Sequence, residues 1–328
     1  MKAFPCRPLF VPPTEAQRHL PEGPRLLRNH GLAGDALLGW VAIQHSPDAH
    51  AGSMEVLNLR TLENDSHPLP ARPGFFAETT TPGVLAVGLE RELALYDLRA
   101  RRLTGRRIPV TDDARVIIND GMAIPGGLLF GTKHLDFKEH IARVYHFDAA
   151  TGGVREMPER QICSNGKFLF DEDGRLLLVD ICSFRKRVEI YEVDFTAGRM
   201  DPVRVIADFA STPLYPDGLR PSPDGRSVIV AFYNPEPAEE GLARQFRISD
   251  GALEAEWRLP GSPRVTCPEI VSLDGAVRAI FTTAVEGMPA TMREHAPMAG
   301  ALFIGDTLFD RVPAPPPLLD PAAFGDIT

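Results

Sequence analysis

The stretch DEDGRLLLVDIC, residues 171–182, joins a tight turn to a continuous apolar run, and this pairing recurs along the chain. Asp173-Gly174 is a dipeptide that favours the positive φ angles of tight turns, and the run that follows has the length and content of a buried strand. Comparable runs, each preceded by Gly or Asp-Gly turn chemistry, begin about 50 residues apart, which is the period of a propeller blade. The six runs are Leu37–Ile43, Val84–Leu89, Leu128–Phe130, Leu176–Ile181, Val228–Phe232 and Val277–Phe281.

A second segment, in which apolar and polar residues alternate, follows each run. A period of two is typical of a strand with one buried face. We interpret each run as an inner strand and each alternating segment as an outer strand of one blade. The sequence therefore predicts a six-bladed β-propeller with four-stranded antiparallel blades, because closing the ring covers sheet edges that would otherwise be exposed. The alternating segments are Val56–Leu59, Leu95–Asp97, Tyr145–Asp148, Tyr191–Asp194, Phe246–Ile248 and Leu302–Asp306.

The repeats leave proline-rich segments at both ends of the chain. We expect residues 1–328 to form a single propeller domain with its core at about 17–310. Residues 1–14 and the tail from Pro313 should be surface arms or a closing latch and not strands, because proline has no backbone N–H to donate. One short helix is predicted over Ala290–His295, directly after Pro289.

Composition excludes several classes of protein. The chain has 44% hydrophobic and 24% charged residues and a net charge of −9. The negative charge argues against a nucleic-acid partner, since phosphate contacts need clustered Lys and Arg. No segment reaches the roughly 20 apolar residues of a membrane helix, and no signal peptide is recognisable. The four cysteines show no disulfide or zinc spacing, so we expect buried free thiols in a cytoplasmic protein. A small-molecule substrate and a monomer or weak homo-oligomer are expected.

Four polar residues stand in turns ahead of the apolar runs of four different repeats: Glu22, Asn119, Asn165 and Asp217. Each is followed by Gly, or by Asp-Gly in the case of Asn119. Taken singly, Asn-Gly and Asp-Gly are more often plain turn formers. Equivalent positions of successive blades converge on the propeller axis, however, so these four side chains could meet there.

Two carboxylates and two amide oxygens are ligands that suit a hard divalent cation. We therefore predict one bound divalent metal ion, Ca²⁺, Zn²⁺, Mn²⁺, Mg²⁺ or Fe²⁺. The chain has no Gly-x-Ser-x-Gly elbow and no nucleotide-binding glycine loop, so a serine esterase and a nucleotide-dependent enzyme find no support.

The motifs around these residues occur in a distinctive order: Glu22-Gly-Pro, Asn119-Asp-Gly, Asn165-Gly and Pro216-Asp217-Gly-Leu. With Leu176–Asp180, Arg264–Pro268 and Met298–Phe303 they resemble the SMP-30/gluconolactonase/luciferin-regenerating enzyme (LRE)-like family over nearly the whole chain. The resemblance implies a six-bladed propeller with a catalytic divalent metal held by Glu22, Asn165 and Asp217. It also implies that Asn119 contacts the substrate. We expect Asp217 to act as the general base and Asn119 to donate to the oxyanion.

Four further positions are predicted to bind substrate. Sugar-lactone members of the family often carry Arg two residues before the Asn119 position, where this chain has Ile117, with Arg115 two residues further back. The methionine of the family's Gly-Thr-Met motif is Lys133, and Asp136 falls near a carboxylate that contacts sugar hydroxyls. Ile117 in place of an arginine weakens the expectation of gluconolactone itself, because Arg suits polar, planar recognition.

Three functions remain open on these residues. The one we predict is a lactonase, a hydrolase that opens a sugar or small hydroxy-acid lactone with metal-activated water. The second is another enzyme on the same metal propeller, either a phosphotriesterase-like hydrolase or a dehydratase or isomerase acting on a natural product. The third is a propeller that binds ligands without catalysis.

Overall fold

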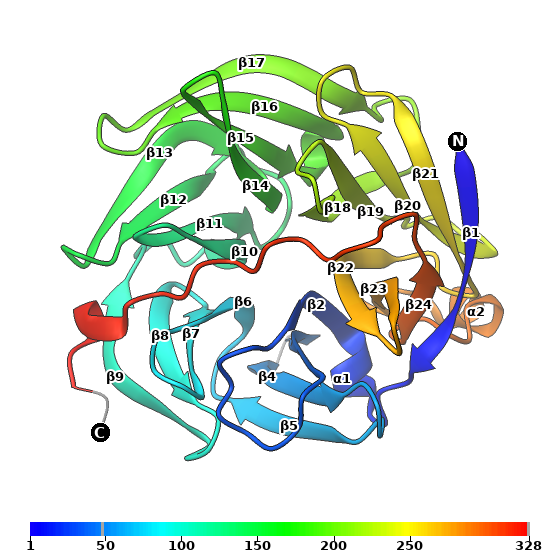
Figure 1. Cartoon of the computed structure of the whole chain (residues 1–328), viewed down its shortest axis with the longest axis horizontal. Coiled ribbons are helices and arrows are strands. Elements are labelled where there is room, and N and C mark those ends of the chain that lie inside the picture. The colour runs from blue at the N-terminus through cyan, green and yellow to red at the C-terminus, as the bar shows by residue number, and fades with distance from the viewer. Residues whose placement is uncertain (47–48, 327–328) are drawn as a thin grey trace.

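The computed structural model describes residues 1–46 and 49–326, which form six four-stranded blades around a central axis (Figure 1). Blade 1 contains β2 (Leu20–Leu26), β3 (Leu37–Ser46), β4 (Ala49–Asn58) and β5 (Asn64–Leu69). Blade 2 contains β6 (Pro73–Glu78), β7 (Val84–Leu89), β8 (Glu92–Asp97) and β9 (Arg102–Pro109). Blade 3 contains β10 (Val116–Ile124), β11 (Gly127–His134), β12 (Ala142–Asp148) and β13 (Gly153–Gln161). Blade 4 contains β14 (Ser164–Glu172), β15 (Arg175–Cys182), β16 (Arg187–Asp194) and β17 (Arg199–Asp208). Blade 5 contains β18 (Tyr215–Pro221), β19 (Ser227–Tyr233), β20 (Glu240–Arg247) and β21 (Leu253–Pro260). Blade 6 contains β22 (Val265–Leu273), β23 (Ala276–Thr283), β24 (Leu302–Asp306) and the N-terminal strand β1 (Lys2–Phe10).

Strand β1 closes the ring. Its first half pairs in parallel with β21 of blade 5, and its second half pairs antiparallel with β24 of blade 6. The latch that we predicted for the N-terminus is therefore present, but the expectation that it is not a strand is wrong. Each half of β1 pairs with one neighbouring strand, so its backbone makes ladder hydrogen bonds on one side only. A strand paired on one side tolerates proline, because the missing N–H can face the unpaired side.

The six apolar runs all fall in the second strand of a blade, and the six alternating segments fall in or overlap the third strand. The innermost strands are instead β2, β6, β10, β14, β18 and β22, so the apolar runs do not line the axis as we expected. The second strands are apolar because neighbouring blades cover both of their faces. In β7, for example, every residue is buried.

The helices are short. Helix α2 (Ala290–His295) has the predicted bounds, whereas α1 (Glu15–His19) was not predicted. The capping box of α1, in which Thr14 and Gln17 satisfy each other's backbone amides, is a sequence signal that could have revealed it. Two short 3₁₀ helices are η1 (Ser183–Arg185) and η2 (Pro321–Phe324). Among the described residues, none of the helices is long and apolar enough to span a bilayer.

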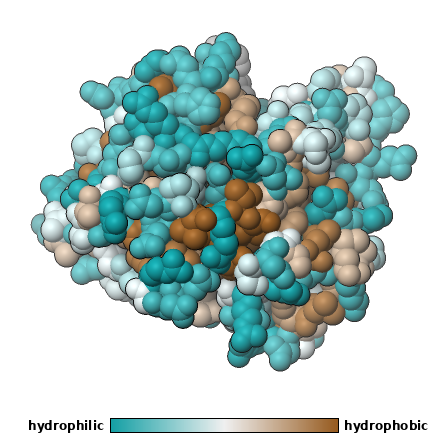
Figure 2. Space-filling view, turned by 90° about the horizontal axis from the view of Figure 1, so that it is seen from above, coloured by the Kyte–Doolittle hydropathy of each residue, from teal (hydrophilic) through white to brown (hydrophobic). Residues whose placement is uncertain are grey.

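The C-terminal tail crosses one face of the propeller, in front of the axis in Figure 1. It contains no strand over residues 313–317, as predicted, and it is fixed where Leu319 bridges to Thr79 of blade 2. Phe324 is fully buried against Phe147 of blade 3. The rim of the molecule is mainly hydrophilic, with apolar residues gathered near the middle of the view in Figure 2.

Candidate functional site

Glu22, Asn119, Asn165 and Asp217 lie on the innermost strands of blades 1, 3, 4 and 5. In each of these strands the pairing with the second strand shifts register at the site residue. A bulge of this kind turns a side chain away from its usual alternation. The four residues are therefore bulged strand positions near the axis, and not turn positions as the sequence suggested.

The glycines beside the site residues allow the innermost strands to approach one another. A Cβ added to Gly166 would lie 2.6 Å from the backbone nitrogen of Leu219 in the next blade. One added to Gly218 would lie 2.5 Å from the sulfur of Cys267 in the blade after that. Only glycine fits at these contacts. The same glycines that resemble turn formers in the sequence bring the site residues of successive blades together.

The four side chains line one cavity of about 260 Å³. Lys133 and Glu286 contribute charged groups to the same wall. The structure thus brings Glu22 and Asp217 together although 195 positions separate them in the sequence. The prediction that equivalent positions of different blades meet near the axis is therefore confirmed.

Asp217 is buried and Glu22 is half-buried, and these two carboxylates lack protein donors. Burial raises the pKa of Glu22 well above its ordinary value, and the negative charge of Asp217 adds to the shift. Burial likewise raises the pKa of Asp217, with a further contribution from Asp120. Lys133 acts in the opposite direction on both groups. Within the described ranges, neither carboxylate accepts a hydrogen bond, so their negative charge is poorly compensated by the protein.

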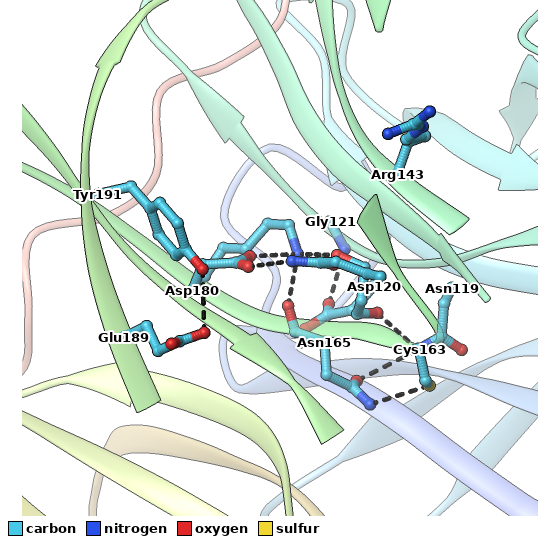
Figure 3. Close-up of polar contacts among 12 residues, drawn as sticks. Asn119, Asp120, Gly121, Arg143, Cys163, Asn165, Asp180, Glu189 and Tyr191 are labelled. Carbon is cyan, nitrogen blue, oxygen red and sulfur yellow. Dashed lines mark hydrogen bonds and ion pairs between the residues drawn. The ribbon is translucent and has the colours of Figure 1, made fainter. Parts of the chain in front are cut away.

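The two amides are oriented by hydrogen bonds to the protein (Figure 3). Asn119 Nδ2 donates to the carbonyl oxygen of Ser164 at 2.9 Å and to Asn165 Oδ1 at 3.2 Å. Asn165 Nδ2 donates to Ser183 Oγ at 2.9 Å. Both amide hydrogens of Asn119 are therefore already used. This arrangement does not support the predicted role of Asn119 as donor to an oxyanion, and it leaves the Asn119 oxygen for a cation or a substrate.

This donor set fits a divalent cation. Two carboxylates without protein donors, one buried and one half-buried, supply together with the amide oxygens the ligands that hard cations prefer. A cation would offset the cost of placing two like charges together away from water. No cluster of three or more His, Cys, Asp or Glu side chains suited to a metal occurs among the described residues. A cation at this cavity would therefore depend on Glu22, Asp217 and the oxygen of Asn165 or Asn119.

Comparison with known proteins identifies the family of this chain. The sequence model described as the SMP-30/Gluconolactonase/LRE-like region matches residues 20–283. The chain belongs to this family. One relative, the L-arabinolactonase of Azospirillum brasilense, is 28% identical over 245 residues, which cover 73% of this chain and 76% of the relative.

Two solved structures have the same fold as this chain over nearly its whole length. The calcium-binding protein regucalcin from Agrobacterium tumefaciens strain C58 has a TM-score of 0.77 at 20% identity, and the match covers 97% of this chain and 99% of that one. A luciferin-regenerating enzyme has a TM-score of 0.73 at 18% identity, covering 94% and 100% of the two chains. The predicted fold and family are thus confirmed.

The other predicted substrate residues of this SMP-30/gluconolactonase/LRE-like protein are not all at the cavity. Lys133 is on its wall, but Arg115, Ile117 and Asp136 are not. The side chain of Arg115 is 55% exposed and pairs with Asp113 and Glu139 at 2.7 and 3.0 Å. Ile117 is buried, and the side chain of Asp136 is 70% exposed. The pair between Arg115 and Glu139 ties the start of β10 to the loop after β11.

The buried ion pair between Lys167 and Asp180, which lies beside Asn165, was not predicted from the sequence. Lys167 Nζ lies 3.0 Å from Asp180 Oδ1 and donates to the backbone oxygen of Asn165 at 2.6 Å and to Ser164 Oγ at 2.7 Å. Gln161 Nε2 donates to the second oxygen of Asp180. This network lies beside the bulge that carries Asn165 (Figure 3). The available signal was a charged residue, Asp180, inside the apolar run Leu176–Ile181.

The aromatic residues on the cavity wall were not predicted either. Phe137, Phe184, Tyr215 and Tyr233 line it together with Leu20 and Pro235. They come from loops, strand ends and the 3₁₀ helix η1, where the sequence has no periodic pattern that would show which way a side chain points.

Proposed function

We propose that this chain hydrolyses a lactone at the cavity described above, with one divalent cation held by Glu22, Asn165 and Asp217 and, through its oxygen, Asn119. The observation that carries the proposal is the convergence of two carboxylates without protein donors and two oriented amides from four blades on one cavity of about 260 Å³. Membership of the family and similarity to an L-arabinolactonase support lactone hydrolysis as the reaction.

A divalent cation at such a site supplies Lewis acidity toward the acyl oxygen of an ester and makes water more acidic. The remaining chemistry belongs to the chain. We assign Asp217 as the base that takes the proton of the attacking water, since its carboxylate lines the cavity and accepts no hydrogen bond from the described residues. The ammonium of Lys133 is on the same wall, where a positive charge stabilises the negative charge that develops on the acyl oxygen.

The reaction balances as a simple hydrolysis. The water oxygen bonds to the acyl carbon, and one of its protons moves to Asp217. The ring C–O bond then breaks, and the released alkoxide takes the proton back from Asp217, so that the base is regenerated and the product is an open hydroxy acid. Asn119 and Asn165 act in this scheme by holding oxygen atoms in fixed positions, because their amide nitrogens are tied to Ser164 and Ser183.

The test is acid release from a panel of aldonolactones and simple lactones, measured for the wild type, Asp217→Asn and Asp201→Asn. Asp201 is a matched control because its side chain is 63% exposed on the outer strand β17. Loss of a general base lowers the rate by about 10²–10⁴-fold, so we expect Asp217→Asn to lose at least about 100-fold in kcat/KM while Asp201→Asn keeps wild-type activity. Equal activity of the two variants would overturn the proposed role of the cavity.

A further inference from the structure

Three aromatic side chains form a continuous apolar surface along one side of the cavity. The rings of Phe137 and Phe184 stack with centroids 5.1 Å apart and planes at 15°. Phe184 meets Tyr215 at 5.3 Å with planes at 57°. The three residues come from blades 3, 4 and 5, and all line the cavity that holds Glu22 and Asp217. We refer to Phe137, Phe184 and Tyr215 as the aromatic shelf.

The backbone that carries Phe137 is held in an unusual conformation. Phe137 has a φ of 55°, in the left-handed region that bulky residues rarely adopt. The buried imidazole of His134 fixes the loop, because its Nδ1 accepts the backbone N–H groups of Lys138 at 3.0 Å and Glu139 at 3.2 Å. Strained residues that are held by their surroundings are typical of ligand sites.

Tyr215, at the other end of the shelf, is fixed as well. The ammonium of Lys186 lies 4.3 Å from the centre of its ring, and the same ammonium donates to the carbonyl oxygen of Thr212 at 2.7 Å. The attraction between this cation and one face of the ring holds the ring in place. Phe184, between the two, is 38% exposed, so a large apolar surface faces solvent beside the cavity.

Besides the charged groups of Lys133 and Glu286, the cavity wall has few polar side chains for sugar hydroxyls, and two of its hydroxyl groups already hydrogen-bond within the protein. Ser183 Oγ already accepts the amide of Asn165, and Tyr233 donates its hydroxyl hydrogen to the backbone oxygen of Glu286 at 2.8 Å. Asp136, predicted to contact sugar hydroxyls, is not on the wall. A hydroxyl that is buried without a partner costs binding free energy, so a polyhydroxylated ring is poorly matched to the shelf side of the cavity.

We propose that the cavity selects lactones that carry a flat apolar substituent, of which an aryl group is the simplest, and that the aromatic shelf covers this substituent while the acyl group faces Glu22, Asn165 and Asp217. The proposal rests on the lactone hydrolysis proposed above and names its substrate class. Stacking an aryl group on the shelf removes the face of Phe184 from water and adds favourable offset or edge-to-face ring contacts.

The test compares γ-phenyl-γ-butyrolactone with γ-butyrolactone, which share the reacting ring, and with L-arabino-1,4-lactone. In the wild type we expect kcat/KM for the phenyl lactone to exceed that for γ-butyrolactone by about 10-fold or more, the gain from burying one aryl group. In Phe184→Ala this ratio should fall about 10-fold, and in Phe184→Tyr it should be retained. The matched control is Phe195→Ala, which removes a ring that stacks on His146 outside the cavity and should keep the wild-type ratio.

The outcomes separate the two proposals. If Phe184→Ala keeps the same ratio as Phe195→Ala, or if the wild type prefers L-arabino-1,4-lactone to the phenyl lactone, the substrate class is wrong although lactone hydrolysis stands. If the wild type opens none of the three lactones, lactone hydrolysis itself fails and the substrate class fails with it. Circular dichroism of each variant confirms that the fold is intact before rates are compared.

Discussion

Replacing Lys167 with Met removes the buried cation that supports the bulge of Asn165. In the structure, Lys167 Nζ lies 3.0 Å from Asp180 Oδ1, and both side chains are 1% exposed. The variant keeps the aliphatic volume of the lysine but leaves Asp180 with Gln161 as its donor and without its cation. The backbone oxygen of Asn165 also loses a hydrogen bond.

The expected magnitude follows from the burial of the pair. Removing one partner of a buried ion pair costs about 3–5 kcal/mol, because the remaining charge is left uncompensated. Replacing both partners, as in Lys167→Met with Asp180→Leu, removes that charge and should restore most of the lost stability. Lys138→Met is the matched control, since its ammonium is 4.0 Å from Asp136 and its side chain is 76% exposed. Such a surface change should stay within about 0.5 kcal/mol.

Urea unfolding, followed by the fluorescence of the two buried tryptophans, Trp40 and Trp257, measures these differences. We expect Lys167→Met to unfold at a clearly lower urea concentration than Lys138→Met, and the double variant to lie between Lys167→Met and the wild type. Coincident midpoints for the two single variants would refute the argument. So would a double variant less stable than Lys167→Met.

Three further changes test the packing and the titration of the fold. Gly74→Ala would place a Cβ 2.3 Å from the backbone oxygen of Asn119, so overpacking should lower the unfolding free energy by about 1–3 kcal/mol and reduce lactone hydrolysis with it. Phe4→Ala should cost about 3–5 kcal/mol in urea unfolding, because its buried ring stacks on Trp257 at 5.5 Å where β1 closes the ring. Burial lowers the pKa of His67 from its ordinary value of 6.5, so the unfolded chain binds a proton that the folded one does not, and stability should fall as the pH drops below 6.5. His67→Gln should reduce that slope by up to about 1.4 kcal/mol per pH unit, and an unchanged slope would exclude His67 as its source.

Much of the architecture could be predicted because the second strand of every blade is covered on both faces and therefore reads as an apolar run. The run Val84–Leu89 has the same bounds as β7, and each of the other five runs lies within its strand. The innermost and outermost strands were harder to find. The former are interrupted by bulges and polar residues, and the latter are largely solvent-facing, as the pattern of β9 shows. Strand β1 was missed because proline content argues against a strand, and only the ring closure explains why it is tolerated there.

The site residues that could be predicted are those whose residue type and place in the repeat are enough to identify them. Glu22 and Asp217 are of this kind, since each precedes a glycine at an equivalent place in its repeat. Arg115 was expected at the cavity because it stands two residues from Ile117, where family members often carry an arginine. Its position is set instead by ion pairs with Asp113 and Glu139, which no local pattern reveals. The aromatic shelf is likewise the product of loop conformations, among them the positive φ of Phe137.

The central claim is that oxygen atoms from separate blades share one divalent cation, and calorimetric titration of chelator-treated protein with Ca²⁺, Mg²⁺, Mn²⁺ and Zn²⁺ tests it most directly. We predict one cation bound per chain by the wild type and by Asp201→Asn, and loss of that binding in Glu22→Gln and Asp217→Asn. Binding of no divalent cation by the wild type, or unchanged binding in both site variants, would contradict the account.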